Sequence, residues 1–80
     1  MEIVRTEKIN SATKNAKYTV ECNRSVIYTP KLENARRHAL EILSKHPGYW
    51  VSIFVIKDKK EVDAGGYYKM VLKQISSLHF

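Results

Sequence analysis

The most apolar stretch of the chain, residues 48–57 (GYWVSIFVIK), limits the possible folds more than any other feature. A strand with one buried face alternates apolar and polar side chains, whereas both sides of this stretch are apolar. Trp50, Phe54 and Ile56 fall on one side. The other side carries Tyr49, Val51, Ile53 and Val55. The pattern predicts a strand whose second face either completes a core or meets a partner.

A helix is predicted immediately before this strand, over about residues 30–46. Apolar side chains recur there at three- and four-residue steps, which is the spacing of one buried helical stripe. Thr29 is the expected N-cap, with Pro30 as the first helical residue, and Pro47 ends the helix. The stripe consists of Leu32, Ala35, Ala39, Ile42 and Leu43.

Strand patterns flank the helix on both sides, separated by polar stretches. The turn between the second and third strands is expected at Asn23–Arg24, and loops are expected over residues 10–16 and 57–66. The resulting order, β-β-β-α-β-β, predicts one α+β domain over residues 1–80. We expect a mostly antiparallel sheet of four or five strands with the helix on one face. The predicted strands are 2–9, 17–22, 25–29, 49–57 and 67–75.

The chain is basic, with 14 lysines and arginines against 8 acidic residues and a net charge of +6. Residues 1–29, 30–47 and 48–80 each contribute +2, so no segment is a basic tail. A basic chain favours nucleic acids, phosphate ligands or acidic proteins as partners. The even distribution leaves the aromatic strand face as the most localised candidate site.

The residues that usually carry catalysis are not arranged for it. His38, His46 and His79 lack the close spacing of metal ligands, and the single cysteine, Cys22, excludes both an intramolecular disulfide and a thiolate cluster. Cys22 falls at an inward strand position, away from the helix N-terminus or cations that activate thiols. Gly65–Gly66 lacks the rest of a phosphate-binding loop. We expect a protein that is not an enzyme and that holds no metal or cofactor.

The first eight residues lack the order of a signal peptide, and no apolar run approaches the roughly 20 residues that span a bilayer. Together with the single cysteine, this favours a cytoplasmic protein without a membrane partner.

Two binding surfaces are predicted. One helix covers one side of a sheet, which leaves Trp50, Phe54 and Ile56 for a protein interface, since tryptophan and other aromatic residues dominate interface hot spots. A homodimer through this face would also enlarge a small core, and we expect it in preference to a monomer.

The second predicted surface is the last strand, where Lys69 and Lys73 share a face with Tyr67. Aromatic rings interleaved with cations hold nucleic acids by base stacking and phosphate neutralisation. Arg36, which has no obvious partner on the helix, is a further candidate phosphate contact. The sequence does not decide between a protein and a nucleic-acid ligand.

The stretch KYTVECNRSVIYTPKLENARRHALEILSKHPGYWVSIFVIKDKKEV resembles short accessory proteins of bacteriophages and mobile elements of low-GC bacteria. The similarity covers about residues 17–75, in which a strand hairpin leads into an amphipathic helix and then into an aromatic strand. It implies a non-enzymatic protein that binds host or phage components, for example as an inhibitor of a host defence complex. The resemblance assigns no functional residue.

Overall fold

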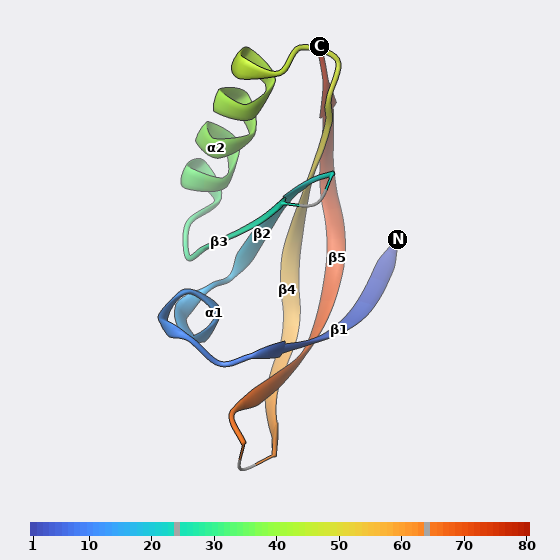
Figure 1. Ribbon diagram of the computed structural model, residues 1–80. Coiled ribbons are helices and arrows are strands. Elements are labelled where there is room, and N and C mark those ends of the chain that lie inside the picture. The colour runs from blue at the N-terminus through green and yellow to red at the C-terminus, as the bar shows by residue number, and fades with distance from the viewer. Residues whose placement is uncertain (24, 64) are drawn as a thin grey trace.

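The computed structural model describes residues 1–23, 25–63 and 65–80. All strands in this part belong to one antiparallel sheet in the order β1-β5-β4-β2-β3 (Figure 1). The predicted α+β class is therefore confirmed. In chain order, the elements are β1 (Glu2–Lys8), α1 (Ser11–Asn15), β2 (Tyr18–Cys22), β3 (Ser25–Thr29), α2 (Leu32–Lys45), β4 (Trp50–Asp63) and β5 (Tyr67–His79).

The predicted order of elements was incomplete, because the expected loop at residues 10–16 contains the short helix α1. A capping box starts this helix: the Asn10 side chain accepts a hydrogen bond from the Thr13 N–H at 3.0 Å, and the Thr13 hydroxyl accepts one from the Asn10 N–H at 2.9 Å. A helix of one turn carries no apolar stripe, so the periodicity of the sequence did not reveal it.

The hairpin of β4 and β5 is also longer than predicted. Residues 57–63 continue β4 where a connection was expected, and β5 runs on to His79. Pairing with β5 overrides the weak strand preference of the lysines and acidic residues in this segment. Gly66, with φ of +86°, supplies backbone freedom in the turn, while Ala64 of the same expected connection lies outside the described residues.

Helix α2 occupies the predicted region, but Thr29 is not its N-cap. Thr29 ends β3, where it pairs with Tyr18 and is buried, and Lys31 takes the N-cap position without a side-chain cap. At the preceding hairpin, Asn23 adopts φ of +50°, which asparagine tolerates, and Arg24 lies outside the described residues.

One side of the sheet, termed here the α2 face, packs against the predicted helical stripe. Ala35, Ala39 and Leu43 of α2 are fully buried, with Leu32 and Ile42 at the margin. The sheet residues of this core are Val20, Cys22, Val51 and Ile53.

The opposite side of the sheet, termed here the concave face, holds a second core. Phe54, Met70 and Leu72 are at most 4% exposed, and the side chains around them come from β1, β3, β4 and β5. The expectation that one helix leaves this face uncovered is therefore wrong for most of its length. Strand β4 is apolar on both sides because it is a central strand between two cores. The surrounding residues are Ile3, Tyr28, Ile56 and Tyr68.

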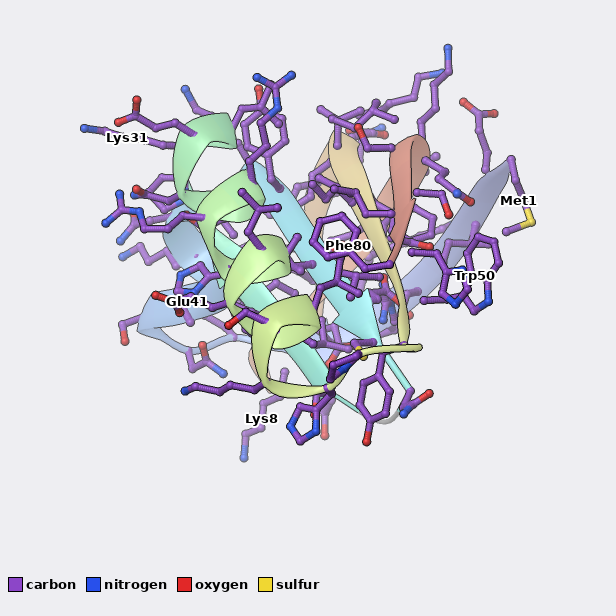
Figure 2. All side chains as sticks on the ribbon, turned by 90° about the horizontal axis from the view of Figure 1, so that it is seen from above. Met1, Lys8, Lys31, Glu41, Trp50 and Phe80 are labelled. Carbon is purple, nitrogen blue, oxygen red and sulfur yellow. The ribbon has the colours of Figure 1, made fainter. Side chains whose placement is uncertain are left out.

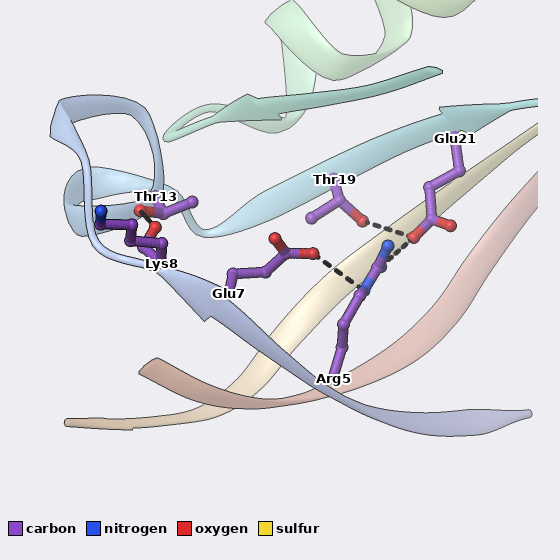
Figure 3. Close-up of polar contacts among 6 residues, drawn as sticks. All are labelled: Arg5, Glu7, Lys8, Thr13, Thr19 and Glu21. Atoms are coloured by element: carbon purple, nitrogen blue, oxygen red, sulfur yellow. Dashed lines mark hydrogen bonds and ion pairs between the residues drawn. The ribbon is translucent and has the colours of Figure 1, made fainter. Parts of the chain in front are cut away.

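The sheet curls strongly toward its concave face. Arg5 on β1 forms an ion pair with Glu21 on β2, although β5 and β4 lie between these strands in the sheet (Figure 3). In a flat sheet these strands would be three spacings apart, about 14 Å. The Thr19 hydroxyl donates to the same Glu21 carboxylate at 3.3 Å, and Arg5 also lies 3.8 Å from Glu7. This polar cluster joins β1 to β2 across the second core.

Candidate protein-interaction site

The upper half of the β4–β5 hairpin, termed here the open end, projects beyond the rest of the sheet (Figure 1). Strand β1 pairs with β5 only from Tyr67 to Lys73. The last contact between the two is the hydrogen bond from the Gln74 N–H to the Met1 carbonyl, which is 3.0 Å long. After Gln74, no strand of the described chain pairs with the outer side of residues 75–79. The open end therefore combines an unpaired strand edge with a stretch of uncovered concave face.

Trp50 lies on this uncovered stretch and is 63% exposed. It sits opposite His79 on β5, and the two rings stack with centroids 4.2 Å apart and planes 4° apart. The His79 ring is held in turn, because its Nε2–H donates to the Gly48 carbonyl at 3.1 Å. The Trp50 ring is thus exposed on one side and supported on the other.

The structure separates the three residues that were predicted to form the interface. Only Trp50 is available at the surface. Phe54 is 4% exposed and belongs to the second core, so its prediction as a surface contact is wrong, and Ile56 is half-buried beside it. The reason is the curl of the sheet, which brings β1 and Tyr28 over this part of the concave face.

A shallow groove lies on the α2 face of the open end, between α2 and β5. It has a volume of about 330 Å³, and its lining is mostly apolar. Leu40 of α2, which is not part of the predicted helical stripe, is 48% exposed on the wall of this groove. Its lining residues are Arg36, Leu40, Ile53, Ser76, Ser77 and Leu78.

The predicted phosphate contacts Tyr67, Lys69 and Lys73 do share one side of β5, where all three are exposed. Lys60 on β4 pairs opposite Lys69 and extends this basic surface, termed here the lysine strip. Nearby, the hydrogen bond and the charge of Lys57 lower the pKa of the exposed Glu2 carboxyl. Arg36 lies instead on the wall of the groove.

The described ranges contain no group of three or more histidine, cysteine, aspartate or glutamate residues that could hold a metal ion. A cleft of about 660 Å³ near the end of α2 brings Cys22 close to His46 and Tyr49. The Cys22 thiol is buried, however, and the His46 ring is stacked on Tyr49 with centroids 4.7 Å apart. Cys22 is therefore part of the core, and His46 and Tyr49 form the rim of the cleft.

Neither the role of His79 nor the unpaired edge of β5 was predicted from the sequence. The pairing of His79 with Trp50 depends on a register that includes a bulge between Ile53 and Phe54, and this is not readable from alternation alone. One feature of the sequence could have indicated the unpaired edge: residues 74–80 (QISSLHF) contain no lysine, arginine, aspartate or glutamate.

Comparisons of this chain with protein-family models, with curated proteins and with solved structures gave no match. None of the helices in the described part of the chain is long and apolar enough to cross a membrane.

Proposed function

We propose that this chain is a small, non-enzymatic binding protein of phage type that acts by occupying the surface of a host protein, with the Trp50–His79 stack as its main contact. One observation carries the proposal: a tryptophan that is 63% exposed and held in a fixed orientation by a neighbouring ring.

A side chain that is already ordered in the free protein costs less entropy to bind. A partner that immobilises a flexible side chain loses affinity to the entropy of ordering it, roughly 0.5 to 1.5 kcal/mol per side chain. The stacking on His79 and the pairing within the hairpin already limit the motion of Trp50. Tryptophan also contributes one of the largest apolar contact areas of any residue, which is why it is enriched in hot spots.

The test begins with capture of partners from a low-GC bacterial lysate on the immobilised chain, followed by purification of each captured protein and measurement of its affinity. Trp50→Ala should weaken binding at least about 30-fold, which corresponds to the roughly 2 kcal/mol of a hot-spot residue. Tyr67→Ala is the matched control, because it removes an exposed aromatic ring from the lysine strip. It should change the affinity less than about threefold.

Thermal unfolding of both variants first establishes that each is folded. Equal affinity of wild type and Trp50→Ala for every purified partner would contradict the proposal. A loss confined to Tyr67→Ala would place the contact on the lysine strip instead.

The second candidate function is binding of nucleic acid at the lysine strip. The observation that favours it is the exposure of Tyr67, Lys69 and Lys73 on one side of β5, next to Lys60. Its test is the salt dependence of oligonucleotide binding, because phosphate contacts release counterions.

A further inference from the structure

The orientation of the main-chain N–H and C=O groups of β5 shows which residues can form hydrogen bonds across its unpaired edge. The Gln74 N–H donates to Met1 on the side of β1, so it points away from β4. Gln74, Ser77 and His79 all pair with β4 residues of the concave face. Residues of one strand whose side chains share a face direct their N–H and C=O groups to the same side. Ser77 and His79 therefore point their main-chain groups into the open edge.

The orientation of Phe80, the residue after His79, agrees with the outward orientation of the Ser77 and His79 main-chain groups. The Phe80 carbonyl accepts a hydrogen bond from the Gly48 N–H at 3.1 Å, on the side of β4. Alternation along the strand then places the Phe80 side chain on the α2 face, which is where Figure 2 shows it, while Trp50 lies on the other side of the hairpin.

The charge pattern of the hairpin is the reverse of what protects a sheet edge. Edge strands usually avoid unwanted pairing by carrying charged side chains, especially lysine. Here, the half of β5 that β1 covers carries Lys69 and Lys73, whereas residues 74–80 beside the open edge carry no charged side chain. In a chain with a net charge of +6, this is the part of the sheet where two copies can approach with least repulsion.

We propose that residues 76–80 pair antiparallel with the same residues of a second copy, so that two sheets become one continuous sheet. A two-fold axis at Leu78 places Ser77 opposite His79 of the second copy. These are the two residues with outward main-chain groups, so they exchange hydrogen bonds in the manner of a hydrogen-bonded antiparallel pair. Leu78 then meets Leu78 of the second copy in the closer, non-hydrogen-bonded position.

The same register explains why the occupant is a second copy. It places Phe80 of the second copy opposite Ser76, on the α2 face. Ser76 lines the groove of about 330 Å³ beside α2, together with Leu40. Phe80, which is 64% exposed in one chain, thus enters a mostly apolar groove on the other chain. The chain carries both the protruding ring and the groove that receives it, as an isologous interface requires.

Sedimentation velocity over a concentration series from about 1 to 500 μM tests the inference. Wild type should shift from monomer to dimer, and Ser77→Pro should stay monomeric, because proline removes the outward N–H. Edge strands tolerate proline where the N–H faces solvent, so the monomer should still fold. Ser77→Ala is the matched control, since it keeps the N–H and should dimerise like wild type.

The groove contact is tested separately with Phe80→Ala, which should raise the dimer dissociation constant about tenfold. Val4→Ala is its control, because Val4 has nearly the same exposure, 63%, and lies on β1. Val4→Ala should leave the dissociation constant unchanged.

Amide hydrogen exchange of wild type tests the pairing of the two β5 edges even if Ser77→Pro fails to fold. The amides of Ser77 and His79 should become protected as concentration rises. A chain that is monomeric throughout the series, or a dimer in which these two amides still exchange freely, would overturn the inference. The inference goes beyond the proposed function: loss of dimerisation with unchanged affinity for a host protein would leave the function at Trp50 intact.

Discussion

At the scale of single residues, Trp50 and Phe54 point to the same face of one strand but have opposite environments. Trp50 is 63% exposed and Phe54 is 4% exposed. The boundary between them is the end of β1, which pairs with β5 up to Lys73, one residue before the partner of Phe54. A four-residue step along β4 therefore leads from a surface site into a core.

The raised pKa of Tyr28 predicts how the stability of the protein depends on pH. Burial, reinforced by the Glu7 carboxylate, raises the pKa of Tyr28 from 10.0 to about 12. Because the folded-state pKa lies above the unfolded value, the neutral phenol stabilises the fold below pH 10, and this contribution disappears as pH rises through 12. Between pH 9 and 12, wild type should lose about 1 to 2 kcal/mol more stability than Tyr28→Phe, after allowance for solvent screening.

Urea unfolding of both proteins at several pH values measures this difference. Other tyrosines and lysines titrate in the same range and affect both proteins equally, so only the difference between them reports on Tyr28. Parallel loss of stability in the two proteins would contradict the assignment.

At the scale of elements, α1 is too short to be stable alone, since isolated helices below about 12 residues are marginal in water. Its C-terminal carbonyls are held by Lys59 of β4, whose ammonium donates to Thr13 at 3.0 Å, Lys14 at 2.6 Å and Ala16 at 3.2 Å. At its start, the Thr13 hydroxyl donates to the Lys8 carbonyl at 3.3 Å (Figure 3). One lysine thus fastens the helix over the concave face.

Lys59→Met should therefore lower the free energy of unfolding by about 1 to 2 kcal/mol, because three carbonyls lose a charged donor. Lys60→Met is the matched control: Lys60 is exposed, and its nearest carboxylate, on Asp58, lies 3.9 Å away. Exposed pairs of this kind contribute little. Urea unfolding compares the variants, and equal effects of the two substitutions would show that α1 does not depend on Lys59.

At the scale of the whole molecule, the net charge of +6 is spread over all three segments of the chain, but the fold gathers part of it on the lysine strip. The second candidate function predicts binding of oligonucleotides there, with an affinity that falls steeply as salt rises, because each phosphate contact releases counterions.

Replacing Lys69 and Lys73 by glutamine should reduce the slope of log affinity against log salt by about 1.5 to 2. The control replaces Lys31 and Lys45, which are exposed at the two ends of α2, and removes the same charge. Fluorescence anisotropy with single- and double-stranded 20-mers between about 50 and 200 mM salt measures both slopes. No binding by wild type at the lowest salt would remove this candidate.

Local patterns in the sequence were sufficient for several parts of the fold. The amphipathic stripe placed α2, because a single buried face imposes its period on the helix that forms it. Alternating or continuous apolar runs placed the strands, apart from the extensions of β4 over residues 57–63 and of β5 to His79. The assignment of Trp50 and Phe54 to the face away from α2 was also correct, since side chains alternate along a strand whatever its partners.

The sequence by itself determined the α+β class, the positions of the strands and of α2, and the side of β4 on which each apolar residue lies. Only the tertiary structure decided that β1 and Tyr28 close over Phe54, that Trp50 stacks on His79, and that residues 75–79 form an unpaired edge. These features depend on sheet order, bulges and curl, which arise from contacts between residues far apart in the chain. A strand at the centre of a two-sided sheet has the same local pattern whether its second face meets its own chain or a partner.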